Sequence, residues 1–290
     1  MVAFRTRQDR LFDVVNAGLL GIVLLLTAYP VYFVVIASVS NPMLVSAGQV
    51  TLLPRGLNFE AYKFIARDER IINGYLNSVL YAAGQTAMSL VLTIPAAYAL
   101  SRREMKGRNL IMALMVFTMY FSGGMIPFYI LIRRLGLIDS RLSLMLPNAV
   151  NVFNIIIART FFSQNIADEL WESAQMDGCT NTRFFLRIAL PLSPAILAII
   201  VLFNVVQSWN AFFSALLFMN TKSKYPLQLV LRQILILGGS LTSSEAASYL
   251  SPDEIARWQF ISDLLRYGII VVAAAPLLIL YPFVQKHFVR

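Results

Sequence analysis

Neutral amide side chains recur at helical spacing in two apolar stretches of the sequence. The first stretch carries Asn148, Asn151 and Asn154. The second carries Asn204, Gln207, Asn210 and Ser214. Residues three or four positions apart share one face of a helix, so each set predicts a polar stripe. Amides donate and accept hydrogen bonds, as sugar hydroxyls do. The stripes therefore predict either the lining of a sugar pathway or hydrogen bonds between neighbouring helices.

The side chains needed for catalysis or metal binding are scarce. Cys179 is the only cysteine and His287 the only histidine among 290 residues. A single cysteine excludes an internal disulfide, and the two residues together cannot supply a usual zinc-ligand set. Acidic residues do not cluster inside the apolar stretches, which argues against a membrane-embedded enzyme. We expect no catalytic residue, no metal site and no cofactor bound by this chain.

The elements that would position the amides are membrane-spanning helices. Apolar residues make up 58% of the chain and charged residues 13%, whereas soluble domains have about 45–50% and 25%. Roughly 20 apolar residues span a bilayer. Six stretches fit: Phe12–Val39, Tyr75–Leu100, Leu110–Ile132, Leu142–Phe162, Pro194–Met219 and Ile261–Val284. We expect an all-α polytopic membrane protein with one transmembrane domain over residues 1–290.

The distribution of basic residues predicts the orientation of the chain. Arginines precede the first expected span, basic residues fill Ser101–Arg108 after the second, and others end the chain. Lys and Arg near span ends favour the cytoplasmic side, so both termini are expected there. The external loops are then residues 40–74 and 221–260. The net charge of +9 is explained by contact with anionic lipid, so no nucleic-acid partner is expected.

A polar segment, residues 164–192, separates the fourth and fifth expected spans on the cytoplasmic side. Acidic residues open a first short helix, where they suit the helix dipole. Gly178 ends that helix because glycine adopts positive φ at little cost. Thr180 or Asn181 can cap the next helix. Such short helices are marginal in water. The segment therefore packs against its own spans or meets another protein.

This segment resembles the E-A-A…D-G…I-x-L-P signature of ABC-importer permeases. The matching residues are Glu172-Ser173-Ala174, Asp177-Gly178 and Ile188-Ala189-Leu190-Pro191. In that family the segment is a coupling helix that docks in a cleft of the cytoplasmic ATPase. The resemblance implies this role for Glu172, Ser173, Ala174, Asp177 and Gly178. Ser173 replaces the usual second alanine, and Cys179 follows the glycine where a small residue is common.

Further stretches are similar to the carbohydrate-uptake branch of that family, the relatives of the smaller maltose permease subunit. They are Gly123–Ser140, Leu146–Phe162, Ser208–Phe213 and Tyr225–Leu235. The resemblance implies a second permease subunit in a heterodimer, an ATPase dimer and an external solute-binding protein in a bacterial inner membrane. The sequence has no phosphate-binding loop, so ATP and Mg²⁺ belong to the partner ATPase and this subunit is non-catalytic.

The substrate expected from this resemblance is an oligosaccharide. Within the branch, the sequence is similar to permeases for complex or acidic oligosaccharides of the alginate type. Six basic residues fall on the predicted outside: Arg133, Arg134, Arg141, Lys222, Lys224 and Arg232. They suit a uronate-type oligosaccharide or an acidic binding protein, and equally lipid headgroups or a partner permease.

Two alternatives to this function remain. One is a permease of the same family for neutral oligosaccharides. The other is an ion-coupled secondary transporter, a class that usually carries charged residues inside its spans. The expected span interiors carry almost no charge, which disfavours the second alternative.

Overall fold

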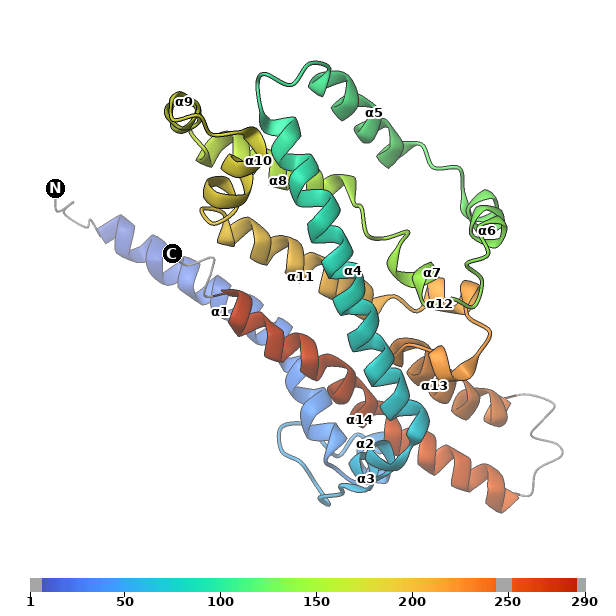
Figure 1. Cartoon of the computed structure of the whole chain (residues 1–290). Helices are drawn as coiled ribbons and strands as arrows, with labels where there is room; N and C mark the ends of the chain where they lie inside the picture. Colours follow the sequence, from blue (N-terminus) through green and yellow to red (C-terminus); the bar gives the residue numbers. More distant parts are fainter. Residues whose placement is uncertain (1–6, 244–251, 286–290) are drawn as a thin grey trace. The chain divides into compact units, whose positions relative to one another are not determined.

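The computed structural model describes residues 7–243 and 252–285, and every regular element in those ranges is a helix (Figure 1). The expectation of an all-α protein is confirmed. His287 and parts of the 221–260 loop lie outside the described residues. The helices are α1 (Arg7–Ser38), α2 (Pro42–Ser46), α3 (Glu60–Arg67), α4 (Glu69–Ser101), α5 (Arg108–Tyr120), α6 (Met125–Arg134), α7 (Leu142–Met145), α8 (Val152–Asn165), α9 (Asp168–Met176), α10 (Asn181–Phe184), the π-helix η1 (Phe185–Ala189), α11 (Pro194–Asn210), α12 (Phe213–Phe218), the 3₁₀-helix η2 (Lys222–Lys224), α13 (Leu227–Ser243) and α14 (Pro252–Gln285).

Three helical stretches within the described residues are long and apolar enough to cross a membrane. They are Asp9–Ser38, Glu69–Ser101 and Asp263–Pro282, and they correspond to the first, second and sixth expected spans. Two bent pairs raise the number to as many as five. Helices α5 and α6 meet at 111°, and the stretch Asn181–Ala189 meets α11 at 85°. The number of six spans stays a prediction.

The third, fourth and fifth expected spans are not single helices, and the fifth is divided into α11 and α12 at Ala211 and Phe212. The chain breaks between α5 and α6 at a segment that includes Gly124, whose φ is +82°. The stretch Leu142–Phe162 is divided into α7 and α8, because Asn151 caps a new helix by accepting a hydrogen bond from the Phe153 amide at 2.9 Å. Helix α8 has 14 residues and rises only about 21 Å, less than the roughly 30 Å of a bilayer core.

Within the described residues, the larger of two compact units comprises residues 69–232 and 275–285, and α4 is its central helix (Figure 1). Helix α4 packs on α7, α8 and α11. The core between these helices contains the fully buried Ile155, Phe162, Ile196 and Ile200. Close approach is required at Gly84, where an added Cβ would lie 2.7 Å from the Met145 sulfur.

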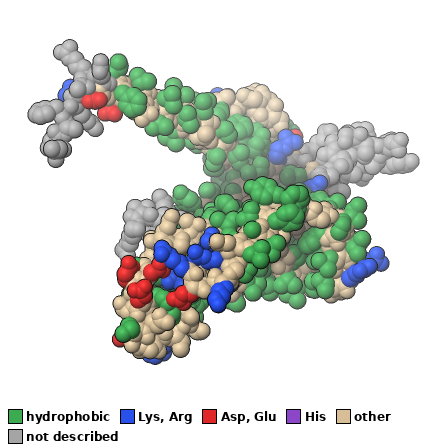
Figure 2. Space-filling model, turned by 90° about the horizontal axis from the view of Figure 1, so that it is seen from above, with side chains coloured by type: hydrophobic (Ala, Val, Ile, Leu, Met, Phe, Trp, Pro, Cys, Tyr) green, Lys and Arg blue, Asp and Glu red, His purple; other side chains and the backbone are tan. Residues whose placement is uncertain are grey.

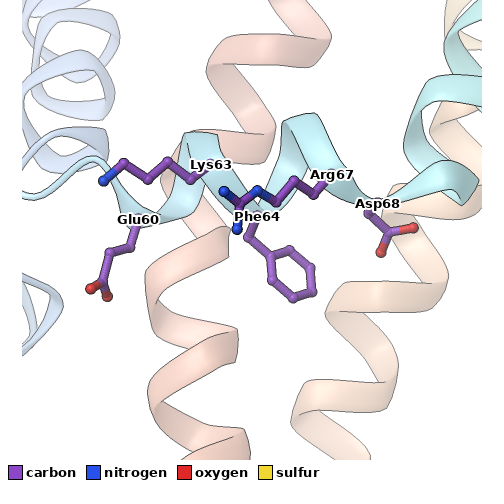
Figure 3. A pocket seen from close by; sticks show the side chains of 5 residues that line it. All are labelled: Glu60, Lys63, Phe64, Arg67 and Asp68. Atoms are coloured by element: carbon purple, nitrogen blue, oxygen red, sulfur yellow. The ribbon is translucent and has the colours of Figure 1, made fainter.

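The second compact unit comprises, of the described residues, 7–68, 233–243 and 252–274. Within it α3 is amphipathic: Ala61 and Ile65 are buried. The other side of α3 lines a pocket of about 480 Å³, whose residues are Glu60, Lys63, Phe64, Arg67 and Asp68 (Figure 3). This unit provides the expected short helix in the 40–74 loop.

Candidate functional site

The polar segment after α8 folds as the sequence predicts. Helix α9 ends at Met176, and Gly178 follows it with a φ of +73°. The Cys179 amide donates back to the Ala174 carbonyl at 2.9 Å and closes the helix end. The Thr180 side chain caps α10 by accepting a hydrogen bond from the Arg183 amide at 3.4 Å. The expected break at Gly178 is confirmed, and of the two cap candidates, Thr180 and Asn181, Thr180 is the cap and Asn181 begins α10.

The residues of the E-A-A-like motif form an accessible surface on α9 and the turn after it. Glu172, Ser173, Asp177 and Gly178 are exposed, whereas Ala174 is half-buried against the core. Met176, between them, is 89% exposed. Figure 2, seen from the α5 and α9 end of Figure 1, shows acidic and basic side chains close together on one part of the surface, and further charged side chains elsewhere. Such a mixed surface is suited to contact with another protein.

A tryptophan that sequence reasoning did not select anchors α9. Trp171 is the one buried residue of α9, and its ring lies edge-on to Phe184 of α10 at 5.1 Å. The Trp171 Nε1 donates to Glu104 Oε1 at 2.7 Å, and Arg103 pairs with Asp168 at 3.2 Å. The Ser101–Arg108 loop, used above only to predict orientation, therefore holds α9. A tryptophan in a short helix with several charged and polar residues is the sequence signal that could have indicated this anchor.

The polar segment joins the membrane-spanning part of the chain through a π-helix. Helix α10 runs directly into η1, where the backbone is wound more widely than in an α-helix. Such π-helical turns are frequent at functional sites. Phe184 is fully buried in the same core as Ile196 and Ile200 of α11. A displacement of α9 and α10 would therefore reach α11.

A second site is a groove of about 610 Å³ in the larger unit. It is formed by the start of α8, the second half of α11 and the end of α14. The lining residues are Asn151, Phe153, Asn154, Leu202, Phe203, Val206, Gln207, Leu277, Leu278 and Tyr281. Pockets of about 300–1,000 Å³ with a few polar groups among apolar ones are typical small-molecule sites.

The groove brings together three of the five candidate pathway residues. Asn154 is 2% exposed, and its side-chain Nδ2 has no hydrogen-bond partner. Asn151 uses its Oδ1 to cap α8, and Gln207 is exposed. Both of these residues leave donor groups for a ligand. Asn154 contributes an unsatisfied buried donor, which costs free energy unless something accepts from it.

The other two candidates do not line the groove. Asn204 is fully buried, and its Nδ2 donates to the Ile200 carbonyl at 2.8 Å within α11. Asn210 is exposed, and its Nδ2 donates to the Val206 carbonyl at 2.9 Å. The expected stripe on α11 is thus divided, with only Gln207 lining the groove.

Aromatic rings complete the groove and were not selected from the sequence. Phe153 and Phe203 stack at a centroid distance of 6.5 Å and an interplanar angle of 28°. Both rings and that of Tyr281 remain substantially exposed. Aromatic surfaces beside amides match a sugar ring, which has an apolar C–H face and polar hydroxyls. Each phenylalanine directly precedes an asparagine of a predicted stripe, a pattern that could have drawn attention to it.

Comparison with known proteins gives the family. No protein-family profile matches the chain. The chain is 40% identical over 285 residues to YtcP of Bacillus subtilis (strain 168), a polygalacturonan/rhamnogalacturonan transport system permease protein, covering 98% of this chain and 96% of YtcP. It is 38% identical over 286 residues to LplC of the same strain, covering 98% and 94%. The chain belongs to the family of ABC sugar-transport permeases.

A solved structure agrees with this permease family. The permease matches one chain in the crystal structure of a bacterial ABC transporter involved in the import of the acidic polysaccharide alginate. The TM-score is 0.85 at 34% identity, and the match covers 99% of this permease and 100% of that chain. The family expected from the E-A-A-like motif is confirmed.

The basic residues of the predicted outer loops are not all available to a ligand. Lys224 of the permease donates to Asp139 Oδ2 at 2.8 Å, and the guanidinium of Arg232 lies 4.7 Å from the ring centre of Phe212. Arg133, Arg134, Arg141, Lys222 and Arg232 are exposed. Five of the six expected basic residues thus have exposed side chains, and Lys224 is half-buried in an ion pair with Asp139.

Asp139 connects two loops of the permease. Its carboxylate accepts hydrogen bonds from the Asn220 and Thr221 amides at 3.0 Å each and from the Thr221 hydroxyl at 2.6 Å. The bond from the Lys224 ammonium, followed by those from Thr221 and the Asn220 amide, holds the pKa of Asp139 well below its usual range. Its φ of 57° is the only positive value at a non-glycine residue in the described chain.

Proposed function

We propose that this chain is the transmembrane permease subunit of an ABC importer for acidic oligosaccharides of the alginate or uronate type. The observation that carries the proposal is the 34–40% identity, over nearly the whole chain, to two proteins whose named substrates are acidic polysaccharides. Alginate and polygalacturonan are both polymers of uronic acids. The five exposed basic residues near α6, α7, η2 and α13 support the proposal, because they would attract such anions.

The proposed importer takes its energy from ATP bound elsewhere. ATP and Mg²⁺ would be held by a separate ATPase dimer, and α9 would dock in its cleft. Glu172 and Asp177 would meet basic groups of that cleft, and Met176 would enter an apolar pocket. A second permease subunit would complete the pathway, and an external solute-binding protein would deliver the sugar. In this arrangement the chain lies in the bacterial inner membrane with both termini in the cytoplasm.

The groove is the proposed contact of this subunit with the sugar. A carboxylate only accepts hydrogen bonds, and the free Nδ2 of Asn154 only donates. The same amide also suits a hydroxyl. Phe153 and Phe203 would contact the apolar face of a sugar ring. Asn154 and Gln207 therefore orient the sugar, whereas the rings contribute contact area without selecting charge.

A neutral oligosaccharide is the second candidate substrate. None of the residues that line the groove is basic, so charge selection by this subunit would depend on the loops outside the groove. That observation favours a neutral sugar more than an acidic one within the groove itself.

The substrate class is tested in the reconstituted complex. Substrate-stimulated ATP hydrolysis is measured with uronate oligomers and neutral oligosaccharides of equal length, at low and high salt. If the substrate is an acidic oligosaccharide, uronate oligomers should stimulate ATP hydrolysis. This stimulation should weaken at high salt, because exposed charges are screened beyond about 8–10 Å. Stimulation by the neutral set alone would reject the acidic substrate and keep the ABC permease assignment.

The groove is tested in the same assay. We expect Asn154→Leu and Gln207→Leu to raise the substrate concentration for half-maximal stimulation about ten-fold each, the effect of one lost hydrogen bond. Asn210→Leu is the matched control on α11, the helix of Gln207, and it should leave this concentration unchanged. Equal effects of all three substitutions would argue against the groove as the sugar contact.

A further inference from the structure

Two arginines bind the helix ends beside α9 in a reciprocal arrangement. Arg159 of α8 donates from Nε to the Leu100 carbonyl in the last turn of α4 at 3.0 Å. Arg102, just after α4, directs Nη2 toward the Ile166 carbonyl at the end of α8 at 3.5 Å. The last carbonyls of a helix lack partners within the helix and carry its negative dipole end. The two cations therefore fasten the ends of α4 and α8 together.

The loop that follows Arg102 holds α9 through a partly buried hydrogen bond. Trp171 is 5% exposed, and its indole N–H donates to the Glu104 carboxylate at 2.7 Å. Hydrogen bonds to a charged partner are about twice as strong as neutral ones. The neighbouring ion pair between Arg103 and Asp168 is largely exposed and contributes little. The bond between Glu104 and Trp171 is thus the main polar link from this loop to α9.

We propose that Glu104 is a positioning residue for energy coupling. Through Trp171 it holds α9 so that a displacement of α9 is transmitted to α4, in addition to the route through η1 to α11. This inference rests on the proposed docking of α9 in the ATPase. Without the bond, α9 would move on its docking partner while α4 stays in place, so ATP would be hydrolysed without transport.

Helix α4 is suited to carry such a displacement over a long distance. It has 33 residues and therefore rises about 50 Å. Toward its other end, Asn77 donates to the Ser223 carbonyl at 2.7 Å and Tyr81 donates to the Lys224 carbonyl at 2.7 Å. One continuous helix, which contains Pro95, thus links the loop that holds α9 to the η2 segment.

The test uses the complete reconstituted transporter and the number of ATP molecules hydrolysed per sugar transported. Glu104→Ala and Trp171→Phe each remove the bond, and Trp171→Phe keeps an aromatic ring against Phe184. We expect either substitution to raise the ratio by on the order of ten-fold, the effect of a lost hydrogen bond to a charged group. The double variant should be no worse than either single variant, because both remove the same interaction.

Two controls separate positioning from general stability. Glu104→Gln keeps an oxygen that accepts from the indole N–H, so its ratio should remain near wild type. Arg103→Ala removes only the exposed ion pair and should have little effect. In the full-length permease without its ATPase, the rate at which a maleimide labels Cys179, the only cysteine of the chain, reports the local fold. It should rise in Glu104→Ala and Trp171→Phe but not in the two controls.

Several results would overturn the inference. An unchanged ratio in Trp171→Phe, with faster labelling of Cys179, would make the bond purely structural. A Glu104→Gln variant as uncoupled as Glu104→Ala would show that the accepting oxygen is not what matters. If Glu104→Ala fails to assemble, the milder Trp171→Phe decides. If Gly178→Val also couples normally, the docking role of α9 is wrong and the inference falls with it. If Gly178→Val uncouples the transporter while Glu104→Ala and Trp171→Phe do not, only the role of Glu104 is overturned.

Discussion

At the scale of single residues, Gly178 constrains the α9–α10 turn through its backbone and not through crowding. Its φ is +73°, and a Cβ built on it would have nothing within 4 Å. A β-branched residue disfavours this left-handed region strongly, whereas asparagine visits it more readily. A substitution by a β-branched residue therefore tests the effect of backbone strain, whereas a substitution by asparagine tests the loss of glycine without that strain.

We predict that Gly178→Val uncouples the transporter and that Gly178→Asn does not. The strain of valine at positive φ is about 1–3 kcal/mol, enough to shift the turn that carries Asp177 and Met176. Substrate-stimulated ATP hydrolysis and sugar uptake should fall about ten-fold or more in Gly178→Val, while the assembled complex persists on size-exclusion chromatography. Normal uptake by Gly178→Val would contradict the coupling role of this segment.

Residue-scale patterns predict local geometry well and burial poorly. Gly178 and Thr180 were recognisable because a helix end and a helix cap depend on the residue itself. Asn154 and Asn204 look alike in the sequence, yet one lines a groove and the other bonds to its own helix. Spacing tells which residues share a helix face but not which neighbouring helix covers that face.

At the scale of elements, Asp139 joins the loop before α7 to the loop before α13. The carboxylate form accepts all of its hydrogen bonds, so the native state lowers the pKa of Asp139 below its unfolded value of about 3.9. A group with a lowered folded pKa stabilises the protein above its unfolded pKa. That contribution is lost as the pH falls through the folded pKa.

We predict that Asp139→Asn lowers the thermal midpoint of the detergent-solubilised permease by a constant amount between pH 5 and 8. The difference from wild type should shrink only below about pH 4. Asp263→Asn is the control, because its ion pair with Arg266 is long, at 3.9 Å, and exposed. A difference that already shrinks between pH 7 and 5 would show that another group titrates.

The elements also show where apolar patterns mislead. The stretch Leu110–Ile132 is apolar throughout, so hydropathy does not reveal the bend of 111° between α5 and α6. Asn151 is a strong cap signal that was interpreted only as part of a polar stripe. The contact between Glu104 and Trp171 joins positions 67 residues apart, and nothing local to either residue predicts it.

At the scale of the whole molecule, the lengths of the helices limit the number of membrane crossings but do not show which side of the membrane each end of a helix faces. Within the part of the chain that the structure describes, three long apolar helices and two bent pairs give between three and five candidate crossings. The direction of the chain across the membrane rests on the basic residues near the first and second spans. Cys179 offers a direct measurement, because it is the only thiol and lies half-buried in the α9–α10 turn.

We predict that Cys179 faces the cytoplasm and lies against the partner ATPase. A membrane-impermeant maleimide added to intact cells should leave it unlabelled, whereas the same reagent should label it in inside-out vesicles. Labelling should slow when the ATPase is bound, because docking covers the turn. A cysteine placed in the docking cleft of the ATPase should form a disulfide with Cys179 under mild oxidation.

The control for orientation is Lys222→Cys in a Cys179→Ser background. Lys222 is exposed in η2, on the predicted outer side, so this variant should label in intact cells and not in sealed inside-out vesicles. Labelling of Lys222→Cys shows that the reagent reaches thiols on the outer side. Without this control, an unlabelled Cys179 would not show that Cys179 faces the cytoplasm. If Cys179 instead labels in intact cells while Lys222→Cys does not, both termini are external. The α9 surface could then not meet a cytoplasmic ATPase, and its exposed acidic residues and Met176 would require an external partner.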